Sequence, residues 1–459
     1  MRQPEIPQPG GMRDQAQSRQ AACRMQPSLL KSGIAVTFLR GLNVVIGFAL
    51  LAVLTRALGP DGLGIYAYAT TFLMLAAIPI SYGWAPLILR AAARALQDGN
   101  WPPVKYMFRR ARLIAAIVTA VALGGGLLLA WIAPAGWPAA AGLTIALLLA
   151  TIFYFDQLSA LRTALLRGVG QAAQGQMPEM LVRPGVQLFI LLVALVTGVV
   201  TLSLEFIFAA LAVASISAYV FGAWLLSKSA PADLTQSVEA EHDPAWAKGA
   251  KVLALSAAIT MVNANTDLLL LGVIGTLEDV GLYKVAVQVS LAGALVYTSL
   301  NMVAVQRFAT GYAAANFQEM QKTATVSARL SALAVVPLAI VLLIYGERLV
   351  PLLFGEAFAA ALAPMLILTF AQFINAGSGM GRSLLMATGL EDVVAKTALL
   401  ALAVKIAACL ALIPSYGAEG AAVASALSLI VWNGVLWWLC WRRHSVDTSA
   451  VGWSFTRPQ

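Results

Sequence analysis

Twelve apolar stretches, each about long enough to cross a lipid bilayer, follow one another along this 459-residue chain. A hydrocarbon layer of about 30 Å needs roughly 20 residues of helix, and a helix satisfies all of its own backbone hydrogen bonds there. A soluble fold is therefore excluded, and we expect an all-α, polytopic membrane protein with 12 transmembrane helices. The stretches cover residues 33–55, 63–87, 111–133, 138–161, 179–200, 203–227, 250–274, 281–305, 325–346, 360–381, 394–414 and 418–441.

Basic residues fall almost entirely in alternate connections between these stretches. Of the 30 Lys and Arg, 25 lie in segments on the same side as the N-terminus, and only Arg56 and Arg348 lie in the opposite loops. The positive-inside rule then predicts a multi-pass protein of the bacterial inner membrane with both termini in the cytoplasm. The net charge of +9 is spread over seven cytoplasmic segments, which argues against a nucleic-acid partner.

The longest polar interruption, from Lys228 to Lys248, divides the spans into two sets of six. We therefore expect two six-helix lobes connected by a cytoplasmic linker, with polar tails at both ends. The predicted boundaries are a disordered cytoplasmic tail at 1–32, an N-lobe at 33–227, the linker at 228–249, a C-lobe at 250–441 and a cytoplasmic tail at 442–459.

The two halves also repeat in sequence. A shift of 217 residues superposes small, aromatic and basic positions without a gap: Gly64 on Gly281, Tyr66 on Tyr283, Arg90 on Arg307 and Lys105 on Lys322. Because each half holds an even number of spans, the halves should be related by an axis along the membrane normal. Two such lobes would enclose a central cavity.

Polar residues within the spans are candidates for lining that cavity, because each costs free energy unless it faces protein or water. In the seventh span, Ser256, Thr260, Asn263 and Asp267 follow one helical face. The residues expected to bind substrate are Arg40, Asn43, Asn263, Lys284, Gln288, Asn301, Gln372, Asn375 and Lys405.

Simpler interpretations stay open for several of these residues. Asn, Ser and Thr in spans often only form hydrogen bonds to a neighbouring helix. Lys284 is near the end of a span, so its ammonium group can reach the headgroup region. Arg40, Asp267 and Lys405 lie too deep for that explanation, and an internal Asp–Arg or Asp–Lys pair is the structural alternative to a role in the cavity.

No constellation of residues typical of an enzyme is present in the sequence. The two histidines, His242 and His444, lie in polar cytoplasmic segments, so neither a membrane histidine relay nor a histidine-ligated metal is expected. The chain has no P-loop or dinucleotide fingerprint. We expect a protein that is not an enzyme and that carries no cofactor or metal.

Four segments resemble the polysaccharide transporters of the multidrug/oligosaccharidyl-lipid/polysaccharide (MOP) exporter superfamily. They are Leu58–Tyr66, Asn263–Leu271 continuing into Gly281–Tyr283, Leu353–Phe358, and Tyr416–Ala422, and the resemblance covers nearly all of residues 33–441. It implies a MATE-like fold with two six-helix bundles around a cationic cavity. In one respect the chain departs from these relatives, because Leu268 follows Asp267 where they often carry a basic residue.

The resemblance implies a Wzx-like flippase that moves a polyprenyl-pyrophosphate-linked oligosaccharide, such as an O-antigen or exopolysaccharide repeat unit, across the inner membrane by alternating access. Arg40, Lys405 and Lys284 could offset the charge of the pyrophosphate while the lipid tail stays in the bilayer. Asp267 could couple transport to an ion gradient by binding H⁺ or Na⁺. Expected partners are the lipid-linked oligosaccharide, membrane lipids, a polymerase and a chain-length regulator.

Two other functions stay open at this point. A cation-coupled multidrug exporter would have the same fold, but its chemistry favours acidic groups, whereas two of the three deepest charges are basic. A membrane scaffold in glycan assembly that does not transport anything would also be compatible with the sequence.

Overall fold

The computed structural model describes residues 29–132, 139–198, 200–229 and 244–452, and every regular element in these ranges is a helix. Eight described helices are long and apolar enough to cross a membrane, or nine if a bent pair counts as one span. The predicted all-α, multi-pass membrane architecture is confirmed, while the count of 12 spans stays a prediction.

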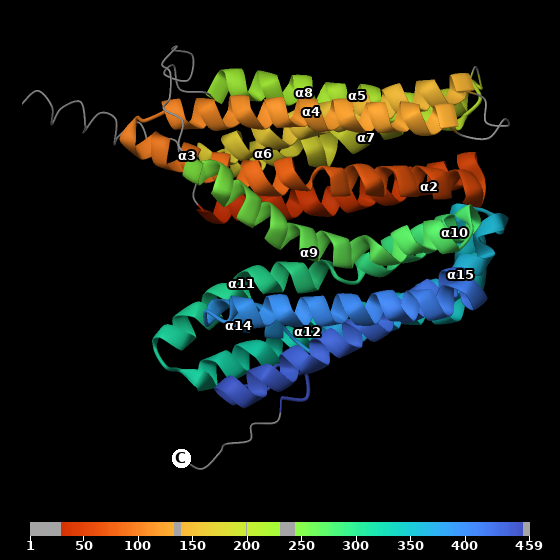
Figure 1. Ribbon diagram of the computed structural model, residues 1–459. Coiled ribbons are helices and arrows are strands. Elements are labelled where there is room, and N and C mark those ends of the chain that lie inside the picture. Colours follow the sequence, from red (N-terminus) through yellow and green to blue (C-terminus); the bar gives the residue numbers. More distant parts are fainter. Residues whose placement is uncertain (1–28, 133–138, 199, 230–243, 453–459) are drawn as a thin grey trace, which may run out of the picture. The chain divides into compact units, whose positions relative to one another are not determined.

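The described part of the first half contains the helices α2 to α8 (Figure 1) and two short π-helical segments. Their bounds are α2 (Leu29–Ala76), η1 (Ile78–Trp84), α3 (Ala85–Asp98), α4 (Pro102–Ile132), α5 (Ala139–Gly168), α6 (Ala172–Met177), η2 (Pro178–Val182), α7 (Arg183–Thr197) and α8 (Leu204–Ser229). The second predicted span therefore does not continue as one α-helix. Pro79 lacks the amide hydrogen that a helix interior needs, and the chain passes through η1 at that point.

The second half contains longer helices and a short 3₁₀ segment. Its elements are α9 (Pro244–Ile274), α10 (Leu277–Ala292), α11 (Leu295–Ala313), α12 (Phe317–Phe354), η4 (Glu356–Ala361), α13 (Leu362–Gly377), α14 (Gly381–Ala387) and α15 (Glu391–His444). The eighth predicted span is bent by 51° between α10 and α11.

Glycines mark the breaks inside the two longest helices. Gly59 in α2 has φ 65° and Gly417 in α15 has φ 48°, and both values are unfavourable for residues with a Cβ atom. Each of these helices is therefore two helical segments joined at a kink. Both glycines lie in segments that the sequence marked as connections between spans.

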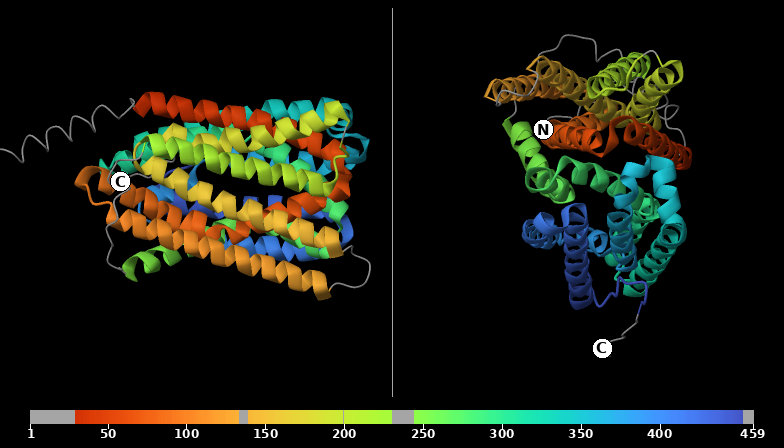
Figure 2. Two further views of the ribbon diagram at one scale, coloured as in Figure 1. Left: turned by 90° about the horizontal axis from the view of Figure 1, so that it is seen from above. Right: turned by 90° about the vertical axis from the view of Figure 1, so that its right-hand side faces the viewer.

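The described chain separates into two compact units. Unit 1 contains residues up to Ile46, Pro79–Gln187 and Ala209–Ala254, and unit 2 contains Gly47–Ile78, Leu188–Phe208 and the residues from Leu255 onward. In unit 1, α4 packs along α5, and the two helices run antiparallel (Figure 2). In unit 2, α13 packs against α10, α12 and α15. The lobe boundaries near 227 and 250 stay a prediction.

The sequence repeat has a counterpart in the contact between α2 and α10 within unit 2. A Cβ atom on Gly64 would lie 1.9 Å from the carbonyl oxygen of Leu277, and one on Gly281 would lie 2.1 Å from the carbonyl oxygen of Pro60. Pro60 and Leu277 are themselves 217 residues apart, as Gly64 and Gly281 are. The contact is therefore reciprocal, and only glycine allows the two backbones to approach this closely.

Candidate functional site

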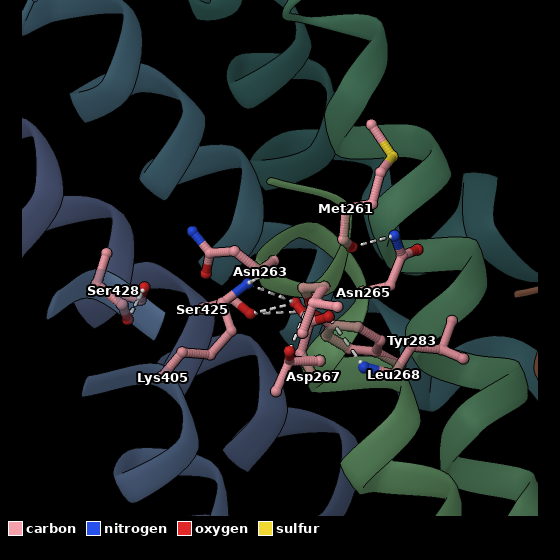
Figure 3. A network of polar contacts seen from close by, with 12 residues as sticks. Met261, Asn263, Asn265, Asp267, Leu268, Tyr283, Lys405, Ser425 and Ser428 are labelled. Carbon is pink, nitrogen blue, oxygen red and sulfur yellow. Dashed lines mark hydrogen bonds and ion pairs between the residues drawn. The ribbon is translucent and has the colours of Figure 1, made fainter. Parts of the chain in front are cut away.

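A carboxylate is buried in the middle of unit 2, where α9, α10 and α15 meet (Figure 3). The Asp267 side chain on α9 accepts a hydrogen bond from the Tyr283 hydroxyl at 2.7 Å and another from the Ser425 hydroxyl. Its second oxygen accepts the backbone N–H of Leu268 at 2.9 Å. The ammonium of Lys405 lies 3.2 Å from the carboxylate. We call Asp267, Tyr283, Lys405 and Ser425 the Asp267 cluster.

The Asp267 cluster forms because two helical segments of α15 face the same part of α9. Lys405 lies before the kink at Gly417 and Ser425 lies after it, so both segments of α15 reach one carboxylate. The N-terminus of α10 is fixed beside the same kink. Asp279 completes a capping box with Thr276 and also accepts the N–H of Ala418 at 3.0 Å.

The internal Asp–Lys pair, one of the two interpretations open from the sequence, is present in the structure. Both side chains are only 8% exposed. A buried charge of either sign is costly unless it is paired and hydrogen-bonded, and here each offsets the other. The cluster is thus close to neutral in this arrangement. If Lys405 moved away, Asp267 would be left as an unpaired negative charge in an apolar interior.

Asn263 lies beside the Asp267 cluster, as its spacing on the seventh span predicted. Its backbone carbonyl accepts the Lys405 ammonium at 2.8 Å. Its side-chain oxygen is buried and has no hydrogen-bond partner among the residues that the structure describes. Leaving a buried acceptor without a donor is costly, so this oxygen is a candidate for binding a donor from a ligand.

Lys284 and Gln288 lie one turn apart on α10, and both are partly buried. Within the described ranges, no hydrogen bond or ion pair involves the Lys284 side chain. An ammonium without a counter-ion in an apolar helix bundle favours an anionic ligand.

The remaining predicted residues of unit 2 form hydrogen bonds between helices. Asn301 accepts the Ser383 hydroxyl at 2.6 Å. Asn375 accepts an N–H of Asn433 at 2.9 Å and donates to Gln372 at 3.1 Å. These contacts join α11 to α14 and α13 to α15, so they match the simpler interpretation of polar residues in spans.

Two predicted residues belong to unit 1. Arg40 is partly buried on α2, and Asn43 on the same helix donates to the carbonyl oxygen of Met180 at 2.6 Å. Because Arg40 and Lys405 lie in different units, a chamber that both of them line stays a prediction.

An ion pair in unit 1 was not anticipated from the sequence. Asp156 on α5 and Arg183 at the start of α7 approach to 2.6 Å. Arg183 also donates to the Ser215 hydroxyl at 3.3 Å. The sequence showed both charges near cytoplasmic span ends, but nothing in their spacing indicated that they would meet.

Tyr283 and Ser425 were also missed as members of the Asp267 cluster. Tyr283 stood out only as a repeat position matched to Tyr66, and Ser425 is one of several small residues on the last span. Ser425 and Ser428 lie one turn apart on a buried face, and a search for hydroxyls at helical spacing would have found them.

Comparison with known proteins gives a family and a fold. Residues 29–311 match the family described as Polysaccharide biosynthesis protein. An inward-facing multidrug resistance MATE transporter of the MOP superfamily has 12% identity and a TM-score of 0.74, covering 90% of this chain and 98% of that one. An outward-facing MATE transporter has 12% identity, a TM-score of 0.65 and coverage of 92% and 98%.

A third solved structure, a MOP transporter from Pyrococcus furiosus, has 12% identity and a TM-score of 0.63, with coverage of 92% and 98%. Its binding pocket is described as having reversed polarity, which suggests a different function for that protein. No curated protein is significantly similar in sequence to the chain. The structural likenesses show the MATE/MOP fold that the sequence predicted.

Proposed function

Because the chain belongs to the polysaccharide biosynthesis protein family, we propose that it is a flippase that moves a polyprenyl-pyrophosphate-linked oligosaccharide across a membrane by alternating access. The observation that carries the proposal is that this family match coincides with the fold of MOP transporters. A family that takes part in polysaccharide synthesis and has a transporter fold fits a step in which a glycan intermediate crosses the bilayer.

The deep basic residues support an anionic cargo. A pyrophosphate with attached sugars cannot cross hydrocarbon without counter-charges and hydrogen bonds. Lys284 has no partner among the described residues, and Lys405 is held by only one carboxylate and one carbonyl. Both ammonium groups can therefore turn to a phosphate when it is present. Arg40 and Gln288 complete the proposed substrate path. The other predicted residues form hydrogen bonds within the helix bundle in the observed arrangement and would join the path only in another state: Asn43, Asn301, Gln372 and Asn375.

We propose that Asp267 couples this movement to an ion. In the observed arrangement the Lys405 ammonium neutralises Asp267. If Lys405 moves to the phosphate of the cargo, Asp267 becomes free to bind H⁺ or Na⁺, because a buried carboxylate requires a counter-charge or a proton. Whether an ion occupies Asp267 would then depend on whether cargo is bound, which couples the two events.

The setting of this activity is also part of the proposal. The distribution of basic residues favours the bacterial inner membrane with both termini in the cytoplasm. The cargo would then move from the cytoplasmic to the periplasmic leaflet, where a polymerase and a chain-length regulator would receive it.

Export of drugs is the second candidate function, because the similar solved structures include multidrug resistance transporters. Cationic drugs require acidic groups that are not already paired. In unit 2 the deep acid, Asp267, is bound to Lys405, which favours the anionic lipid over the drug.

A binding comparison separates the two candidates. The purified protein would be titrated with a short-chain polyprenyl-pyrophosphate oligosaccharide and with a cationic drug. We expect saturable binding of the lipid-linked oligosaccharide, weakened about tenfold in Lys284→Gln because a charge-assisted hydrogen bond is lost. Lys396→Gln removes an exposed lysine from the start of α15 and serves as the control. Binding of the drug alone, unchanged or stronger in Lys284→Gln, would contradict the flippase assignment.

A further inference from the structure

A groove of about 620 Å³ lies between α11 and α12, near the turn that joins these helices in unit 2. One face of each helix lines it at helical spacing, with Asn316 at the turn. The lining includes Val303 and Arg307 on α11, and Glu319, Lys322, Val326 and Leu330 on α12.

Charge in the groove is concentrated at the end near the turn. Arg307 and Lys322 are each about seven residues from the turn, or roughly 10 Å along their helices. Among described residues, neither side chain forms a hydrogen bond or an ion pair. The one acid of the lining, Glu319, is held by Asn316 at the start of α12.

Apart from Ser327, the other end of the groove is lined by apolar side chains. Val303, Val326 and Leu330 are 53%, 46% and 47% exposed, and they extend away from the basic end along the two helices. A site with a basic end and an apolar wall matches the shape of a membrane lipid, which has a phosphate at one end and acyl chains at the other.

We propose that this groove binds an anionic phospholipid, with its phosphate on Arg307 and Lys322 and an acyl chain along Val303, Val326 and Leu330. Basic pockets between membrane helices on the cytoplasmic side are typical sites for acidic lipid headgroups. The distribution of basic residues predicts that side for the α11–α12 turn. Arginine can bind two phosphate oxygens at once, while lysine adds a point charge. The site is separate from the Asp267 cluster and does not depend on what the protein transports.

The test titrates three lipids in parallel series into the delipidated full-length protein in micelles: phosphatidylglycerol, phosphatidylcholine and a polyprenyl diphosphate. Native mass spectrometry counts the bound lipids. We expect one saturable site for phosphatidylglycerol and much weaker binding of phosphatidylcholine. In Arg307→Gln/Lys322→Gln the affinity for phosphatidylglycerol should fall about 30-fold, since each basic residue near a membrane surface contributes about fivefold.

Two further variants distinguish lipid binding in the groove from nonspecific electrostatic binding to the protein surface. Arg348→Gln/Lys396→Gln makes the same charge change at two exposed positions outside the groove and should bind like the wild type. Val326→Trp keeps both charges but fills the groove from an exposed position, and it should weaken binding at least tenfold. All variants should melt like the wild type in lipid-free micelles.

Three results would overturn the proposal. Equal weakening in both double variants would indicate attraction by surface charge alone. Wild-type affinity in Val326→Trp would show that the lipid does not occupy the groove. Saturable binding of a polyprenyl diphosphate at Arg307 and Lys322, without binding of phosphatidylglycerol, would make the groove a cargo site instead.

Discussion

The Asp267 carboxylate is held by side chains from α10 and from both segments of α15. Three donors bind one of its oxygens, and the nearest cation is Lys405. Such a pair contributes little net stability compared with apolar residues, but removing one member leaves an uncompensated charge in an apolar interior. The cluster therefore adds little to the net stability of the fold, but it disfavours other arrangements of α9, α10 and α15.

Lys405→Met should destabilise the protein by about 3–5 kcal/mol, because Asp267 would then be charged, buried and unpaired. Adding Asp267→Asn should restore part of that loss, since a neutral amide does not need the ammonium. Thermal unfolding in micelles of the wild type, both single variants and the double variant gives the coupling energy. Purely additive effects of the two substitutions would contradict the ion pair.

The sequence predicted part of this cluster. Asp267 and Lys405 stood out because opposite charges at span depth must find partners. Tyr283 and Ser425 carry no charge, and their role depends on which helical faces meet in three dimensions. The same holds for Asp156 and Arg183 in unit 1, which meet only because α5 and α7 pack together.

At the scale of elements, the reciprocal contact of α2 and α10 imposes a strict steric requirement on two glycines. Gly64→Ala and Gly281→Ala would each place a Cβ atom about 2 Å from a backbone oxygen, so the helices must separate. We expect each substitution to cost about 1–3 kcal/mol, the usual range for overpacking. Gly47→Ala is the matched control on α2, because no described atom beyond its own stretch of helix lies within 4 Å of its Cβ position.

Melting curves of the three variants in micelles measure this cost. Gly47→Ala should equal or exceed the wild type, because alanine favours a helix over glycine. If Gly64→Ala and Gly281→Ala were as stable as Gly47→Ala, the close approach of α2 and α10 would be wrong.

The sequence predicted where the helices lie along the chain, but it did not predict the π-helical segments or the bend within a span. Hydropathy located the spans because each must be apolar for the thickness of the bilayer, and the turn at Gly417 was recognisable from its segment. The π-helical segments η1 and η2 depend on how particular turns pack, which hydropathy does not encode. The bend between α10 and α11 was likewise unpredicted.

At the scale of the whole molecule, the positive-inside count predicts the membrane orientation. Reporter fusions test this orientation. Reporters that are active on only one side of the membrane would be fused after His444 and inserted next to Arg348. A cytoplasmic reporter should be active after His444, and a periplasmic reporter should be active next to Arg348. The opposite pattern would reverse the proposed orientation and move the α11–α12 groove to the other side of the membrane.

The family and the two-fold repeat of the chain were recognisable from short segments whose order and spacing matched a known superfamily. No local pattern in the sequence specifies how two such lobes pack against each other. A cavity lined by both Arg40 and Lys405 therefore stays a prediction, because these residues lie in different units.

Flipping of a fluorescent polyprenyl-pyrophosphate oligosaccharide in proteoliposomes tests the central claim most directly. We predict that the wild-type protein exposes inner-leaflet cargo to a membrane-impermeant quencher, that an imposed H⁺ or Na⁺ gradient speeds this exposure, and that Asp267→Asn removes the effect of the gradient. Exposure no faster than in protein-free vesicles, from preparations with the wild-type melting curve, would contradict the assignment as a flippase.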